Sequence, residues 1–310
     1  MSRDDWTTVT WAAALLILAA LLPLTGDGYM ISLGVSIAMY TALATSWALF
    51  SGPTHYISLA TAAFFGIGTY VTGTGIEYLN YWLLLPLAAI AGGVVAALVG
   101  LATLRLSGVY FVIFTLGLAE MIRQLVTWVQ NKTGHKGTYV LTDFDDSDIY
   151  WQLLVLVALV YLVGWAIGRS RLGFALRIIG DDEEVARHVG INTALSKVAL
   201  FVVSGAVAAV VGAIIAPRYV YIEPSTAFTP MLSFQVVIMA LLGGTGRLWG
   251  PLVGVVPFTL LWEAISSSFP NQTTLLLGLS FLAIVYLLPG GFVGLWDRTR
   301  ARMASRGALA

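Results

Sequence analysis

The chain alternates between long apolar runs and short polar connections over nearly its whole length. Each run is close to the roughly 20 apolar residues that an α-helix needs to cross a bilayer. The pattern therefore predicts an all-α polytopic membrane protein with about ten transmembrane helices. The third and eighth runs are the weakest, because they are short and rich in glycine, serine and threonine. The predicted spans cover residues 7–25, 29–50, 57–74, 81–104, 108–130, 149–168, 198–217, 230–246, 249–267 and 273–289.

The composition agrees with this class. Hydrophobic residues make up 58% of the chain, charged residues 10%, and the mean hydropathy is +0.87, whereas soluble domains carry about 25% charged residues. The absence of cysteine excludes disulfides, thiolate catalysis and Cys-ligated metal. The first run follows Arg3, lacks a small-x-small cleavage site and precedes further spans, so we expect a retained helix rather than a signal peptide.

Positive charge is distributed unevenly between the two sets of connections. With ten spans and a cytoplasmic N-terminus, Lys132, Lys136 and Arg218 fall outside, Arg123 lies within a span, and all other lysines and arginines fall on the cytoplasmic side. The positive-inside rule therefore favours two cytoplasmic termini. We expect one transmembrane domain over residues 1–297, with a cytoplasmic loop at 169–197, and a basic cytoplasmic tail at 298–310.

The loop at 169–197 is the longest polar interruption, and it carries the signals of a short helix. Asp181 is predicted as the N-cap, with Glu184 three residues later as in a capping box. Gly190 is predicted at the left-handed C′ position. Acids lie at the start of this helix and bases at its end, as the helix dipole favours: Asp182, Glu183, Arg187 and His188.

A helix this short is marginal in water and needs a surface to rest on. Four consecutive acids make an anionic lipid surface a poor match. We favour docking onto a cytoplasmic partner protein, with a plain structured loop as the alternative.

The sequence shows no catalytic, cofactor or metal motif. It lacks GxxxxGK[ST], so no P-loop is present and ATP would have to be bound by another chain. The three histidines are far apart and have no ligand spacing. Gly246, Gly250 and Gly254 form a small-residue stripe that suits a tight turn and close helix packing.

Charges within the predicted spans are more informative. Glu120 and Arg123 are three residues apart on one face of a helix, and Glu263 lies in the ninth span. Such charges are expected to point into the bundle or a watery path, and the sequence leaves open whether the first two pair with each other. Two roles stay open for them: a buried brace, or a lining of the translocation path. Polar, glycine-rich stretches near 52–61 and 225–235 are candidate broken helices, which often mark a substrate path.

Several motifs, in the expected order, resemble one known family. They are LRLSGVYFVIFTLGLAEMIR (104–123), GFALRIIGDDEEVARHVGIN (173–192), ALLGGTGRLWGPLVG (240–254) and LLPGGFVGL (287–295), and ISLATAAFFGIGTY (57–70) adds to them. Together they are similar to the permease subunits of branched-chain amino acid ABC importers, in particular to the second of the two permease types.

The resemblance implies an importer permease bundle of the type II-like kind in a bacterial or archaeal plasma membrane. It implies four kinds of partner: a related second permease, two cytoplasmic ATPases that bind ATP and Mg, an external substrate-binding protein and lipid. Glu184, Ala186 and Gly190 match the family's EAA–Gly loop, so the short helix, with Asp181 and Arg187, is expected to couple the permease to an ATPase.

The substrate is less well indicated. The family's loop after the fifth span usually reads close to TGGxxG, whereas this chain has Thr133-Gly134-His135-Lys136-Gly137. The resemblance favours hydrophobic or neutral amino acids, and urea or short amides are the alternative because a close branch carries them. A stand-alone secondary transporter using Glu120 and Glu263, or an intramembrane enzyme, would be a different class of protein.

Overall fold

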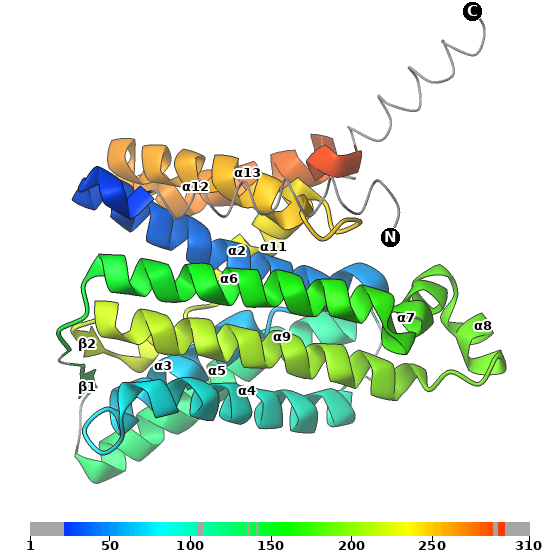
Figure 1. Cartoon of the computed structure of the whole chain (residues 1–310), viewed down its shortest axis with the longest axis horizontal. Coiled ribbons are helices and arrows are strands. Elements are labelled where there is room, and N and C mark those ends of the chain that lie inside the picture. Colours follow the sequence, from blue (N-terminus) through cyan, green and yellow to red (C-terminus); the bar gives the residue numbers. More distant parts are fainter. Residues whose placement is uncertain (1–21, 104–107, 135–136, 141, 288–290, 295–310) are drawn as a thin grey trace, which may run out of the picture.

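The computed structural model describes residues 22–103, 108–134, 137–140, 142–287 and 291–294, and in these ranges it is almost entirely helical (Figure 1). The α-helices are α2 (Gly28–Thr54), α3 (Thr61–Gly75), α4 (Tyr81–Thr103), α5 (Val109–Thr133), α6 (Asp146–Arg169), α7 (Arg171–Asp181), α8 (Glu183–His188), α9 (Thr193–Ile215), α10 (Pro224–Ala227), α11 (Pro230–Gly243), α12 (Gly250–Ser268) and α13 (Thr273–Leu287). Short 3-10 turns are η1 (Leu22–Thr25), η2 (Ala216–Arg218) and η3 (Pro270–Gln272), and the strands are β1 (Thr138–Tyr139) and β2 (Tyr221–Ile222).

Within the described residues, seven helical stretches are long and apolar enough to cross a membrane: α2, α4, α5, α6, α9 with η2, α10 with α11, and α12. This confirms the predicted all-α polytopic class. Helices occupy nine of the ten predicted spans, although α3 and α13 have only 15 residues each. The first predicted span, apart from its last residues in η1, and the tail at 298–310 lie outside the described residues, so the ten-span count stays a prediction.

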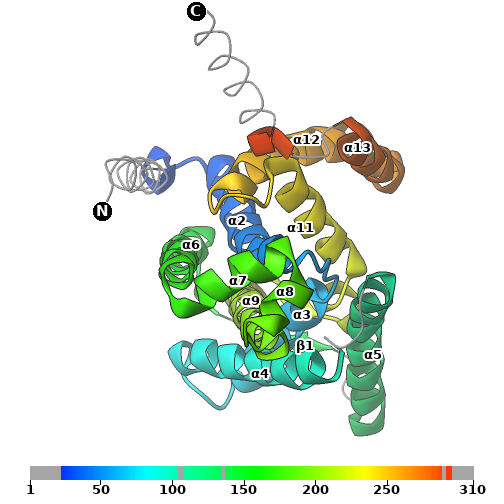
Figure 2. The same ribbon diagram turned by 90° about the vertical axis from the view of Figure 1, so that its right-hand side faces the viewer.

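Helix α9 lies in the middle of the bundle, with α2, α3, α4 and α6 packed around it (Figure 2). It approaches α3 most closely where two glycines face backbone. A Cβ atom at Gly68 would lie 1.7 Å from the carbonyl oxygen of Ala209, and one at Gly212 would lie 2.0 Å from that of Phe65. Only glycine fits at these positions, and close backbone packing of this kind is usual between membrane helices.

The predicted small-residue stripe packs α11 against α12. A Cβ atom at Gly250 would lie 1.9 Å from the carbonyl oxygen of Gly244, and one at Gly254 would lie 2.1 Å from that of Met239. The packing role is therefore confirmed for these two glycines. Gly246 makes no such close approach and instead lies in the turn between α11 and α12, the other role that the sequence predicts for the stripe.

The helices are interrupted at both places where the sequence predicts a break. Residues 55–60 separate α2 from α3, and residues 228–229 separate α10 from α11. The two regions contact each other, because the hydroxyl of Ser233 donates to the carbonyl of Leu59 at 2.8 Å and accepts from the amide of Ala62 at 2.9 Å. Non-helical backbone inside a membrane bundle needs such partners, since lipid offers none.

The polar connections gather at two opposite ends of the bundle (Figure 1). At the strand end, β1 pairs antiparallel with β2, and Arg218 forms an ion pair with Asp146 at 3.3 Å. At the other end, α7 and α8 project from the bundle beyond the start of α9; we call this the α8 end. The loop at 169–197 and Arg218 thus lie at opposite ends, as the charge pattern predicts.

Candidate functional site: the α8 segment and the polar face of α5

The loop at 169–197 contains two helices where the sequence analysis expects one. Helix α7 is amphipathic, and its buried residues Gly173, Leu176 and Ile179 recur every third residue on one face. That face packs against α2, α6 and α9, while Phe174 is exposed. Ser170 caps its first turn by accepting a hydrogen bond from the amide of Gly173 at 3.3 Å. Helix α7 therefore forms a rigid base for the shorter helix that follows.

Helix α8 begins one residue later than predicted. Asp181 is the last residue of α7, and the N-cap of α8 is Asp182 in an extended conformation. The carboxylate of Asp182 accepts hydrogen bonds from the amides of Glu184 at 2.8 Å and Val185 at 3.2 Å. The predicted N-cap is therefore wrong, and so is the capping box, because Glu184 is only two residues from the true cap. The cause is that α7 continues through Asp181 and leaves the next acid to start the new helix.

The C-terminal end of α8 is as predicted. Gly190 has φ +82° and occupies the C′ position after the C-cap Val189. The amide of Ile191 donates to the carbonyl of Ala186 at 3.0 Å, and the amide of Gly190 donates to that of Arg187 at 3.1 Å. These two bonds are the Schellman pattern, so both ends of this six-residue helix are closed by specific hydrogen bonds.

The two sides of α8 differ sharply. Ala186 is completely buried and belongs to the main hydrophobic core of the chain. The opposite side is exposed and combines acidic, basic and apolar groups; we call it the outward face of α8, made of Glu184, Val185, His188 and Val189. Of the residues predicted to couple to an ATPase, Ala186 thus faces its own chain, and Glu184 faces away from it.

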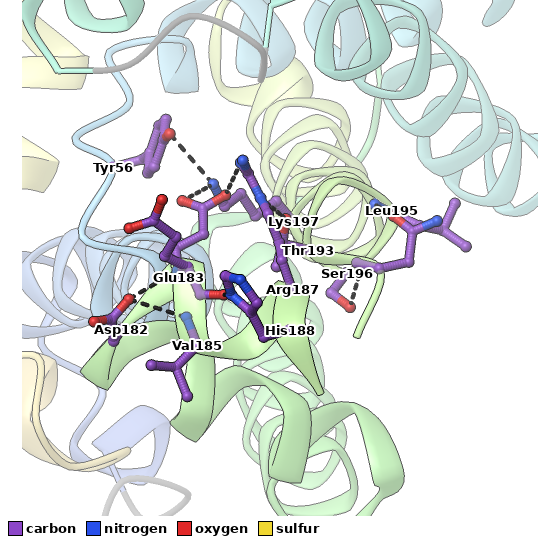
Figure 3. A network of polar contacts seen from close by, with 12 residues as sticks. Tyr56, Asp182, Glu183, Val185, Arg187, His188, Thr193, Leu195, Ser196 and Lys197 are labelled. Carbon is purple, nitrogen blue, oxygen red and sulfur yellow. Dashed lines mark hydrogen bonds and ion pairs between the residues drawn. The ribbon is translucent and has the colours of Figure 1, made fainter. Parts of the chain in front are cut away.

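A polar network holds α8 to the start of α9 (Figure 3). The carboxylate of Glu183 accepts hydrogen bonds from Lys197 Nζ at 2.6 Å and from Arg187 Nη2 at 2.8 Å. Lys197 Nζ also donates to the hydroxyl of Tyr56 at 3.2 Å, and the guanidinium of Arg187 lies within 3.4 Å of the hydroxyl of Thr193. Burial opposes ionisation of Glu183, but the hydrogen bonds from Lys197 and Arg187 outweigh it and hold the pKa of this carboxyl below its usual value.

Glu120 and Arg123 form an ion pair, which settles a point that the sequence analysis leaves open. Arg123 Nε donates to a carboxylate oxygen of Glu120 at 2.8 Å, and Gln124 donates to the other at 2.8 Å. The side chains of Glu120 and Arg123 are 47% and 29% exposed, so within this chain the pair is not buried, whereas a position on a watery path stays open. All three residues also lie on α5, so the pair joins no two helices and cannot act as a brace between them. Helix α5 is the least buried of the seven candidate spans.

A polar pocket continues from this pair toward the strand end. It has a volume of about 230 Å³ and lies between the C-terminal half of α5 and the segment from β2 to α10. Basic, acidic, amide and hydroxyl groups share its lining: Arg123, Thr127, Gln130, Asn131, Tyr221 and Glu223. Glu263, the third predicted charge, does not join this group and is exposed on α12, which packs against α2 and α11.

The sequence analysis missed the connection between Glu183, Lys197 and Tyr56. It treats Glu183 only as a charge near the helix dipole and Lys197 only as one cytoplasmic cation. One available signal is that Lys197 stands at the entrance of an apolar span with Val198, Leu200 and Phe201 after it. A lysine at such a position calls for a polar partner, but which residue that is depends on the fold.

Comparison with known proteins gives a consistent result. A family model described as "Branched-chain amino acid transport system / permease component" matches residues 29–288. The high-affinity branched-chain amino acid transport system permease protein LivM of Escherichia coli K12 is 25% identical over 314 residues, covering 90% of this chain and 73% of that protein. LivH of the same organism is 28% identical over 54% of this chain and 52% of its own length. The fructose import permease protein FrcC of Rhizobium meliloti is 28% identical over 43% of this chain and 39% of its own length.

No solved structure gives a significant match to the chain. The family model, in contrast, spans nearly all of the described helices, from the start of α2 to the end of α13. The chain therefore belongs to the family of permease components of branched-chain amino acid transport systems.

Proposed function

We propose that the chain is a membrane-spanning permease subunit of an ABC importer that moves branched-chain or other hydrophobic, neutral amino acids into the cytoplasm. Similarity to the amino acid permease LivM extends over 90% of the chain, whereas similarity to the fructose permease FrcC extends over 43%. The longer match supports an amino acid rather than a sugar. The energy would come from separate ATPase subunits that bind ATP and Mg.

The observation that carries this proposal is the construction of α8. A six-residue helix is capped at both ends and buried on one side at Ala186, yet its outward face has no partner within the described residues of this chain. Isolated helices of this length are not stable in water. The hydrogen bonds at both ends and the burial of Ala186 therefore keep α8 folded and its outward face exposed. A cytoplasmic ATPase with a cleft that accepts Val185 and Val189 and pairs with the neighbouring acids would fit it.

The proposal also assigns the two ends of the bundle to the two sides of the membrane. The α8 end would face the cytoplasm together with both termini, and the strand end would face the external substrate-binding protein. The excess of arginine in the connections on the α8 side supports this orientation.

We place the translocation path along the polar face of α5. One side of α5 is buried through Phe111, Thr115, Leu118 and Ala119, and the exposed side carries the Glu120–Arg123 pair. A charged group within a span has an unfavourable free energy in contact with lipid, so it usually faces a watery path or another protein surface. A second, related permease packed beside α5 would enclose this face, and the pocket at its strand end would be the external entrance.

The docking role can be tested with two matched valines. Val189 at the α8 end is 63% exposed and Val220 at the strand end is 62% exposed. Val189→Arg places a cation at the C-terminal end of α8, where the helix dipole favours positive charge, so the helix is expected to stay folded. The large charged side chain should, however, prevent a partner from docking on the outward face. We expect Val189→Arg to abolish co-purification of the ATPase subunits and Val220→Arg to preserve it. Equal co-purification by both variants would contradict the docking role.

Two further measurements separate the alternatives for function and substrate. Uptake into vesicles by this chain alone, abolished by a protonophore, would identify a secondary transporter and overturn the proposal. Equilibrium binding of leucine, phenylalanine, urea and fructose to the external binding protein would decide the substrate, and binding of urea or fructose but neither amino acid would overturn that part of it.

A further inference from the structure

Lys197 is a buried cation with partners from two other parts of the chain. It lies in the second turn of α9 and is 1% exposed. Its ammonium group contacts the carboxylate of Glu183 on α8 and the hydroxyl of Tyr56 in the break between α2 and α3, and it lies 4.3 Å from the centre of the Tyr56 ring. A buried charge is tolerated only while it is paired, so Lys197 is expected to follow Glu183 when α8 moves, and its contacts with Tyr56 extend that constraint to the break.

Tyr56 in turn belongs to the non-helical segment 55–60, which is bonded to helices on several sides. The amide of Leu59 donates to the hydroxyl of Thr115 on α5 at 3.0 Å, and the carbonyl of Ser58 accepts from the indole of Trp47 on α2 at 2.7 Å. The hydroxyl of Ser233 on α11 contacts the same segment. The segment therefore cannot shift without disturbing α5 and α11.

The ring of Tyr56 makes a second connection to α5. It packs edge-on against the ring of Phe111, with 5.3 Å between the ring centroids, and Phe111 is completely buried in the first turn of α5. Phe111 also contacts Phe50 on α2 and Phe201 on α9. Dense aromatic packing of this kind transmits a displacement rather than absorbing it.

We propose that the contacts Glu183–Lys197–Tyr56 mechanically link the docking helix α8 to the broken segment 55–60 and, through it, to α5. This linkage rests on the proposed function. An ATPase bound to the outward face of α8 would move α5, the helix that carries the Glu120–Arg123 pair, through these contacts. Lys197 and Tyr56 are then positioning residues: they touch neither ATP nor substrate, and they determine whether a movement of α8 reaches the path.

The test uses the assembled importer reconstituted in vesicles, with ATP hydrolysis and substrate uptake measured on the same preparation. Tyr56→Phe keeps the ring against Phe111 and removes only the hydroxyl that Lys197 contacts. We expect the complex to assemble and hydrolyse ATP, while the uptake per ATP hydrolysed falls by about 2- to 30-fold, the range for changes along a coupling network. Tyr81→Phe is the matched control, since its hydroxyl joins α4 to α6 through Gln152 outside the linkage.

A second variant keeps the test decisive if one substitution disturbs folding. Lys197→Met replaces the cation by an apolar chain of similar length in the same buried position, and we expect the same loss of uptake per ATP. Combining Tyr56→Phe with Lys197→Met should add little to Lys197→Met alone, because Tyr56→Phe removes a contact that Lys197→Met already removes. Unchanged uptake per ATP in both single variants would overturn the linkage. Failure of the unmodified chain to bind ATPase subunits would instead overturn the proposed function.

Discussion

The carboxylate of Asp182 accepts a hydrogen bond from the backbone amide of Glu184 at 2.8 Å, and this contact marks where α7 ends and α8 begins. Two consecutive aspartates stand at this junction, but only the second has the extended backbone of an N-cap. Asp181 is still helical. Asp182 is therefore the N-cap of α8, and the neighbouring Asp181 provides a matched control for substitutions of the cap.

We expect Asp182→Ala to destabilise α8 by about 1 kcal/mol, because two backbone amides lose their acceptor. Asp181→Ala should change the stability of α8 little, since its side chain is exposed and caps no helix. Hydrogen exchange of the amides at 183–190, followed by mass spectrometry, measures both. Faster exchange in Asp181→Ala than in Asp182→Ala would show that the cap is assigned to the wrong residue.

Gly190→Ala should loosen the other end of α8. Its backbone is left-handed, with φ +82°, and a Cβ atom there costs about 1–2 kcal/mol. Gly246→Ala provides the comparison, because Gly246 has open space around it and is not among the glycines with positive φ. We expect a lower melting temperature and weaker ATPase binding for Gly190→Ala alone, and equal effects of the two substitutions would contradict the Schellman role.

Acid should weaken the α8 end through Glu183. Because the pKa of this carboxyl is lower in the folded chain than in an unfolded one, its ionised form stabilises the fold above the ordinary glutamate pKa of about 4.3. That contribution is lost as the pH falls through the lower folded-state pKa. The difference in melting temperature between the unmodified protein and Glu183→Gln should therefore be large at neutral pH and shrink in acid. A difference that stays constant would exclude the assignment.

Substitutions on α5 distinguish a path from a structural role. Arg123→Gln and Glu120→Gln change residues that are partly exposed and bonded only within their own helix. We expect normal folded yield and assembly, with uptake reduced several-fold by each. Glu263→Gln, on α12, should leave uptake unchanged. Reduced yield of the α5 variants in detergent would point to a structural role for the pair.

The sequence predicts the spans well because each depends on a local property, the apolar length needed to cross a bilayer. It also predicts Gly190, whose role follows from its place after a short helix. The spacing of Glu120 and Arg123 puts both groups on one helical face, although the sequence leaves their pairing open. The breaks near Gly52–Thr61 and Ser225–Gln235 are found for the same reason, since glycine, proline and serine interrupt helices locally.

What the sequence could not supply depends on contacts between distant positions. The N-cap falls on Asp182 because α7, an additional helix recognised only through its packing on α2, α6 and α9, extends through Asp181. Lys197 meets Tyr56 across 141 positions of sequence. The exposure of Glu120 depends on which side of α5 the other helices cover, and no local pattern records that.

The complete enclosure of Ala186 has a consequence for how this protein could be re-engineered. Helix α8 is held in place by the buried Ala186, by the bonds of Glu183 to Lys197 and Arg187, and by the end residues Asp182 and Gly190. None of these contacts uses the side chains of Glu184, Val185, His188 or Val189. Under the proposed function, the helix is an interchangeable adaptor, whose recognition surface can be rewritten for a different motor subunit while the contacts that hold it are left unchanged.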